Sequence, residues 1–272
     1  MRCHPVAIIV LLALGIFVGL VPAEAQQPTR VPRIGLLDYA PSWEPLRQGL
    51  RELGYVEGQN LLLEYRPTAG RYERLPALAA ELVQLPVDVI VTFGTPSTLA
   101  ARDATTTIPI VMVAAGDPLG NKLVTSLARP EGNITGLSIM GAELSAKRLE
   151  LLREVVPTVA RVAFLWNPTN LSHVTDLADI QGAAKALGVQ LISVEVSRPD
   201  AFERALAAML RDSPDALIMT ADPMHQLYAG RIVDFASTHR LPTMHQLREH
   251  VVAGGLISYG ASLCAEDHFA HF

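Results

Sequence analysis

A short segment occurs twice in this sequence, and this repeat restricts the fold more than any other feature. The first copy is 88–96 (DVIVTFGTP) and the second is 215–223 (DALIMTADP). Each copy is an apolar, strand-like run followed by a turn and a proline that suits the first turn of a helix. Two copies so far apart predict two similar lobes, because a solenoid would repeat over a much shorter period.

The segments around these copies also recur in the same order. The corresponding pairs are 33–38 with 161–166, 53–54 with 187–188, 61–66 with 191–196, and 108–110 with 241–243. Apolar runs predict strands near 33–37, 60–65, 88–93, 109–113 and 133–138, and again near 161–166, 189–196, 216–220, 242–246 and 255–259. Helices are expected near 43–53, 71–85, 97–103 and 120–128 in the first lobe. Alternating strands and helices predict an α/β fold of two similar, doubly wound parallel-sheet lobes with a cleft between them.

The expected domain organisation follows from these patterns. Residues 1–25 combine a basic start, an apolar run and an Ala-Glu-Ala site, which predicts a cleaved secretory signal peptide. The first lobe is expected over 31–139, a crossover helix over 140–158, and the second lobe over 159–259. Cys264 is the single cysteine after the signal segment, so we expect no disulfide within the mature chain. The net charge of −5 does not favour binding to nucleic acid.

Polar residues that follow the strands are the candidate ligand-binding residues, because ligands of parallel sheets bind at the carboxyl ends of the strands. The candidates are Asp38, Tyr39, Gly94, Thr95, Ser97, Gly116, Asp117, Asn167 and Asp222. We expect Thr95 to cap the helix that begins at Pro96. The Thr95 and Ser97 hydroxyls and nearby backbone N–H groups are expected to hold a ligand carboxylate, and Asp117 a ligand ammonium.

The aspartates also have a purely structural interpretation. Asp117 and Asp222 each precede a proline, and each is expected to cap the helix that follows. Asp38 has no following proline, so a ligand contact is favoured more strongly there. His225, His239, His245 and His250 lack the spacing of a helical metal site, and Ser97 lies in no G-x-S-x-G motif. We therefore expect no metal, no cofactor and no catalytic residue.

Several longer phrases resemble one family of exported proteins. They are LRELGYVEGQN (50–60), RYERLPALAA (71–80), FGTP (93–96), TTTIPIV (105–111), GDP (116–118), RPEGNITG (129–136), AKRLELLR (146–153) and GGLISYG (254–260). They are similar to ABC-transporter substrate-binding proteins of the family that includes tryptophan- and tyrosine-binding members. The resemblance implies a type I periplasmic-binding-protein fold, no enzyme activity, and a membrane permease and an ATPase as partners.

The sequence departs from this family after Leu263, and the segment 260–272 is expected to be an atypical, truncated tail. The favoured function is capture of a small solute, an amino acid or a small carboxylate, by a monomer in the periplasm. A ligand-sensing module without transport and an exported α/β enzyme are the alternatives. A sensor would need an output domain, and an enzyme would need an acid–base or nucleophile set at the strand ends.

Overall fold

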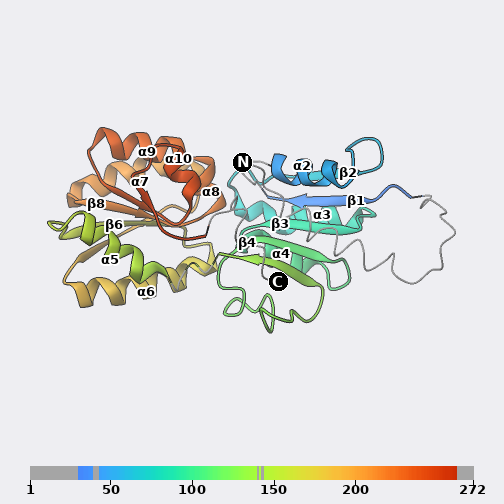
Figure 1. Ribbon diagram of the computed structural model, residues 1–272, viewed down its shortest axis with the longest axis horizontal. Coiled ribbons are helices and arrows are strands. Elements are labelled where there is room, and N and C mark those ends of the chain that lie inside the picture. Colours follow the sequence, from blue (N-terminus) through green and yellow to red (C-terminus); the bar gives the residue numbers. More distant parts are fainter. Residues whose placement is uncertain (1–29, 39–42, 140, 142–143, 262–272) are drawn as a thin grey trace. The chain divides into compact units, whose positions relative to one another are not determined.

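The computed structural model describes residues 30–38, 43–139, 141 and 144–261 (Figure 1). The predicted signal peptide at 1–25, Tyr39 and the tail from 262 on lie outside these residues. The described chain forms two compact units. The first contains 30–69 and 73–138, and the second contains 70–72 and 139–261. The helix expected in the crossover at 140–158 is α5 (Ser145–Val155), and it belongs to the second unit.

The first unit is built on a parallel sheet with the strand order β2-β1-β3-β4-β5. Its elements are β1 (Arg33–Leu37), α2 (Glu44–Glu52), β2 (Leu62–Arg66), α3 (Leu75–Gln84), β3 (Val89–Phe93), α4 (Thr95–Ala104), β4 (Ile110–Ala115) and β5 (Ile134–Ser138). The 3-10 helix η1 (Tyr72–Arg74) precedes α3, and its first residue belongs to the second unit. Every residue of β3 and β4 is buried, as in a strand that is covered on both faces.

The second unit repeats this topology. Its parallel sheet has the order β10-β9-β8-β6-β7, so its first strand again lies between its second and third. After α5 follow β6 (Arg161–Trp166), α6 (Leu171–Leu187), β7 (Gln190–Glu195), η3 (Pro199–Ala201), α7 (Phe202–Met209), η4 (Leu210–Asp212), β8 (Ala216–Met219), α8 (Pro223–Leu227), α9 (Ala229–Thr238), β9 (Thr243–His245), α10 (Arg248–Val252) and β10 (Ile257–Ser258). The two-lobed parallel α/β fold expected from the repeat is confirmed.

The first residue of each repeated segment has the same structural role in both units. The Asp88 carboxylate accepts a hydrogen bond from the backbone N–H of Arg33 at 2.7 Å. The Asp215 carboxylate accepts from the N–H of Arg161 at 2.8 Å. Each aspartate therefore fixes the start of the neighbouring first strand. Hydrogen bonds from the backbone N–H groups of Ala160 and Arg161 lower the pKa of Asp215.

Two local expectations are wrong. Residues 120–128 form turns instead of a helix, and the Asp117 side chain accepts from the Gly120 N–H at 2.9 Å within the first turn. The N-cap of α4 is Gly94, with a φ of 80°, and Thr95 is already the first helical residue. Asp117 thus stabilises a turn, while the predicted cap at Asp222 is present and accepts from the Met224 N–H.

Gly136 is a position where the sheet tolerates no side chain. Its φ is 140°, and an added Cβ would lie 2.0 Å from the backbone oxygen of Met112 on the adjacent strand. The register between β4 and β5 shifts after Met112, which brings the two backbones into this arrangement.

We expect Gly136→Ala to destabilise the first unit by more than the ~1–3 kcal/mol typical of backbone strain alone, because the clash is with backbone atoms. The measurement is urea unfolding of the full chain. Gly182→Ala is the matched control, because Gly182 is helical and no atom would lie within 4 Å of its Cβ. That control should stabilise by roughly 0.5–1 kcal/mol. Similar effects of the two substitutions would contradict the prediction.

Candidate functional site

The carboxyl ends of β1, β3 and β4 bring together most of the residues predicted in the first unit. Asp38 directly follows β1 and is buried, and its carboxylate accepts a hydrogen bond from the hydroxyl of Thr68, which follows β2. The Thr95 hydroxyl accepts from the Gly116 N–H at 2.9 Å and lies 3.1 Å from the Gly116 carbonyl oxygen. Thr95 therefore links the end of β3 to the end of β4.

The two hydroxyls expected to meet a ligand are engaged with the protein backbone. Ser97 is buried and donates to the Phe93 carbonyl at 2.6 Å, while Thr95 is paired with Gly116. Both hydroxyls therefore stabilise the turn after β3 through hydrogen bonds to the backbone. Their contact with a ligand carboxylate stays a prediction, and so does the contact of Asp117 with an ammonium group.

The backbone of the first unit is strained at the same edge. Asp38, Ala114 and Asp117 have φ values of 78°, 56° and 43°. A left-handed conformation is uncommon for residues with a side chain, and strain of about 1–3 kcal/mol per residue occurs preferentially at functional sites. Three such residues therefore lie at the ends of two strands, where the predicted ligand-binding residues of the first unit gather.

Asp222 is the centre of a buried polar cluster in the second unit. Its side chain has no exposed surface. One carboxylate oxygen accepts from the Tyr72 hydroxyl at 2.8 Å and from the Met224 N–H at 3.0 Å. The other accepts from the Asn170 side-chain amide at 2.9 Å, and the Asn167 amide lies 3.5 Å from both oxygens. Four groups of the second unit therefore surround one carboxylate.

These contacts determine the charge of Asp222. Burial on its own would raise the pKa of this carboxyl, but His225, His173 and the hydrogen bonds from Asn170 and Tyr72 outweigh burial and lower the pKa. His173 is oriented by the Asn167 N–H, which donates to its Nδ1 at 3.2 Å. The His173 Nε2 lies 3.9 Å from the Asp222 carboxylate and 3.3 Å from the Asn170 side-chain nitrogen. Asp222 is thus an ionised acceptor inside the second unit.

Sequence reasoning found Asn167 and Asp222 but missed their buried neighbours. Tyr72, Asn170, His173, Thr220 and His225 complete the cluster. Asn170 had a detectable signal, since an asparagine before the periodic run of α6 suits an N-cap, and its side chain does accept from the Ser172 N–H. Tyr72 had none, because its assignment to the second unit depends on tertiary contacts.

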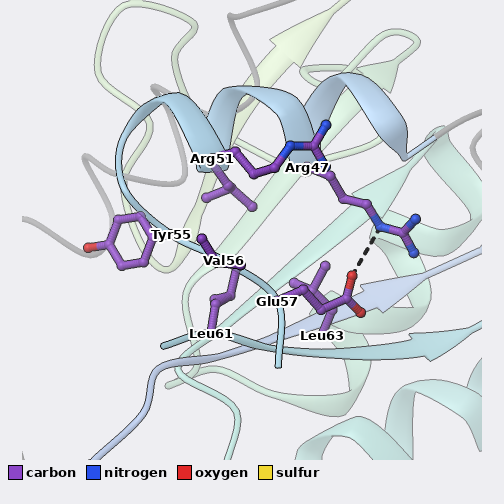
Figure 2. Close-up of a pocket in the computed structure, with 8 residues that line it drawn as sticks. Arg47, Arg51, Tyr55, Val56, Glu57, Leu61 and Leu63 are labelled. Carbon is purple, nitrogen blue, oxygen red and sulfur yellow. Dashed lines mark ion pairs between the residues drawn. The ribbon is translucent and has the colours of Figure 1, made fainter. Parts of the chain in front are cut away.

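A hollow on the first unit is less suitable as a ligand site. It has a volume of about 140 Å³ and is lined by Arg47, Leu50, Arg51, Tyr55, Val56, Glu57, Leu61 and Leu63 (Figure 2). Arg47 forms an ion pair with Glu57 at 3.2 Å, so its charge is already neutralised. Sites for drug-sized ligands usually have about 300 Å³ or more.

Within the described residues, no group of three or more histidine, cysteine and acidic side chains has the arrangement of a metal site. Among the same residues, no helix combines the length and the apolar character needed to cross a membrane.

Comparison with known proteins identifies the family of this chain. The model of the ABC transporter substrate binding protein family matches residues 42–264, and the chain belongs to this family. It is 25% identical over 225 residues to the tyrosine-binding protein of Clostridioides difficile (strain R20291). That match covers 81% of this chain but 64% of the relative, so the chain spans less than two thirds of the relative's length.

Two solved structures share the fold. A conserved domain protein from Vibrio cholerae O1 biovar El Tor is 26% identical, with a TM-score of 0.75 over 84% of this chain and 78% of that one. The ABC domain from Streptococcus pneumoniae in complex with L-Trp is 23% identical, with a TM-score of 0.73 over the same shares, 84% and 78%. The fold expected from the family resemblance is therefore confirmed.

Buried histidines make the stability of the second unit dependent on pH. Burial lowers the pKa of His225 and His245 to about 4 and that of His250 to about 3. Below its ordinary pKa near 6.5, each imidazole binds a proton in the unfolded chain but stays neutral in the folded one. Stability should therefore fall between about pH 6.5 and pH 4, by up to ~1.4 kcal/mol per pH unit for each histidine.

Urea unfolding between pH 7 and pH 4.5 measures this slope. His250→Leu should reduce it by about one histidine's share, ~1.4 kcal/mol per pH unit. His239→Asn, at an exposed position, should leave it unchanged. Asp176 acts in the opposite direction. Burial raises the pKa of this carboxyl, so the folded state binds its proton more readily than the unfolded chain as the pH falls. A slope that is the same in His250→Leu as in the unmodified chain would contradict the assignment.

Proposed function

We propose that this protein captures a small solute and delivers it to an ABC importer. The observation that carries the proposal is the gathering of buried polar groups at the carboxyl ends of the strands in both units of a substrate-binding family member. Asp38, Thr95 and Gly116 provide these groups in the first unit, and Asp222 with Asn167 in the second. Such edges are the usual ligand sites of open parallel sheets.

An amino acid with an apolar side chain is the proposed ligand class. Ionised carboxylates attract an ammonium group, and the backbone around α4 favours a carboxylate. Leu171 and Val174 lie in the first turn of α6, the helix that Asn170 caps, and are 53% and 51% exposed, so this helix end carries exposed apolar side chains. The relatives named for tyrosine binding and for an L-Trp complex support this choice.

The remaining parts of the proposal concern partners, location and chemistry. A permease and an ATPase of an ABC importer are the proposed partners, and the proposed location is the periplasm, reached by cleavage of a signal peptide after Ala25. We propose a monomer without enzymatic activity. In support, the Ser97 hydroxyl donates to a backbone carbonyl, whereas the hydroxyl of a catalytic serine would be bonded to a general base.

Calorimetry with L-tyrosine, L-tryptophan and a panel of other amino acids tests this function. Asp222→Asn should weaken binding about tenfold or more, because a hydrogen bond to a charged group contributes roughly 1.5–3 kcal/mol and ~1.4 kcal/mol is tenfold. Thr95→Ala combined with Ser97→Ala should weaken it similarly if the turn after β3 holds the carboxylate.

Asp215→Asn is the matched control. Asp215 lies at the opposite end of the same strand from Asp222 and bonds the N–H groups of Ala160 and Arg161. This variant should lower the unfolding temperature and leave the affinity unchanged. If no amino acid in the panel binds, the ligand class is wrong. If Asp222→Asn binds as tightly as the unmodified chain, the ligand site lies away from Asp222.

A further inference from the structure

Arg148 is a fully buried cation that holds two distant backbone segments of the second unit. It projects from α5, and its side chain is 1% exposed. Its Nε donates to the Tyr259 carbonyl at 2.7 Å, and its Nη1 donates to the Gly141 carbonyl at 2.9 Å. Gly141 precedes the first helix of the unit, and Tyr259 follows its last described strand. One guanidinium therefore fixes the backbone at both places.

A chain of buried hydrogen bonds continues from Arg148 toward Asp222. The Ser145 hydroxyl lies 3.3 Å from Arg148 Nη1 and 3.4 Å from Asp176 Oδ1. Gln246 donates from its side-chain nitrogen to Asp176 at 3.2 Å and accepts from the Ala221 N–H at 2.6 Å. Ala221 directly precedes Asp222, so the chain of contacts ends in the loop that carries the ionised carboxylate.

The two backbone segments fit closely against this network. A Cβ at Gly141 would lie 3.2 Å from Asp176 Oδ1. A Cβ at Gly260 would lie 2.3 Å from the Gln246 backbone oxygen and 3.2 Å from Arg148 Nη2. At Gly141 and Gly260 the backbone therefore packs closely against residues of the network, which leaves little space for the backbone to move toward them.

We propose that Arg148, Asp176 and Gln246 are positioning residues that couple the Asp222 loop to the backbone at 141 and at 259–260. None of the three is assigned a contact with the ligand. Through them, the position of the loop depends on the position of the two segments, and the dependence is reciprocal. The inference rests on the proposed function only in taking the Asp222 loop as ligand-binding.

Hydrogen exchange measured by mass spectrometry on the full, ligand-free chain tests the coupling from one end. Arg148→Lys keeps the charge but replaces the planar guanidinium with a single ammonium, which cannot bond both carbonyls in the same geometry. Exchange should become faster in peptides covering 139–145 and also in those covering 219–224, by about tenfold where a charge-assisted hydrogen bond is lost. Peptides of β6 should exchange as before.

Gln246→Glu tests the coupling from the other end. It keeps an oxygen that accepts from the Ala221 N–H but replaces the donor to Asp176 with a carboxylate. Exchange at 139–145 should again become faster. Lys147→Gln is the control, because Lys147 lies on the same helix and pairs with the exposed Glu150. It should leave both sets of peptides unchanged.

The proposal is overturned if Arg148→Lys speeds exchange only in peptides covering 139–145. It is also overturned if Gln246→Glu speeds exchange only in those covering 219–224. Each side chain would then stabilise only the backbone next to it. If Arg148→Lys also speeds exchange in the β6 peptides, the variant is globally destabilised. The Gln246→Glu result then decides whether the two regions are coupled. Because no ligand is added, this outcome is independent of whether any amino acid binds in the calorimetric panel.

Discussion

The second unit depends on the burial of an ionised carboxylate, Asp222, at the carboxyl ends of its strands. Asp222 has no exposed surface, and its desolvation would favour the protonated form. Donors from Tyr72, Asn170 and the Met224 backbone oppose this effect, and they come from three separate places in the chain. Each donor has to be positioned by its own helix or turn. The conformation of the loops at this edge therefore depends largely on supplying hydrogen-bond donors to one buried charge.

The first unit has the same sheet topology as the second but stabilises its strand ends with different side chains. Its strand order is the same, but its edge is held by the hydroxyls of Thr95 and Ser97 and by residues with left-handed backbone. Hydroxyls bonded to backbone carbonyls keep a turn in place without introducing charge. The repeat therefore preserved the strand-start aspartates Asp88 and Asp215, which support the fold, while the strand-end residues diverged.

Membership in the substrate-binding family and the polar edges of the sheets support the same function from independent directions. The family match covers most of the chain, whereas the buried contacts of Asp222 and Arg148 come from the structure. Binding proteins need affinity at one place and conformational response at another. A buried network of hydrogen bonds joins the Asp222 loop to the backbone near 141 and 259, and the proposed coupling would run through this network.

The sequence by itself determined the two-lobed α/β architecture, because strand and helix periodicity and the repeat at 88–96 and 215–223 are local, readable patterns. It also determined that Asp222 caps a helix, since a proline follows it. The tertiary structure alone decided that Tyr72 belongs to the second unit, that Gly94 rather than Thr95 caps α4, and that Arg148 binds the carbonyls of Gly141 and Tyr259. The Tyr72–Asp222 and Arg148–Tyr259 contacts join residues 150 and 111 positions apart, and their geometry depends on packing that no local pattern encodes.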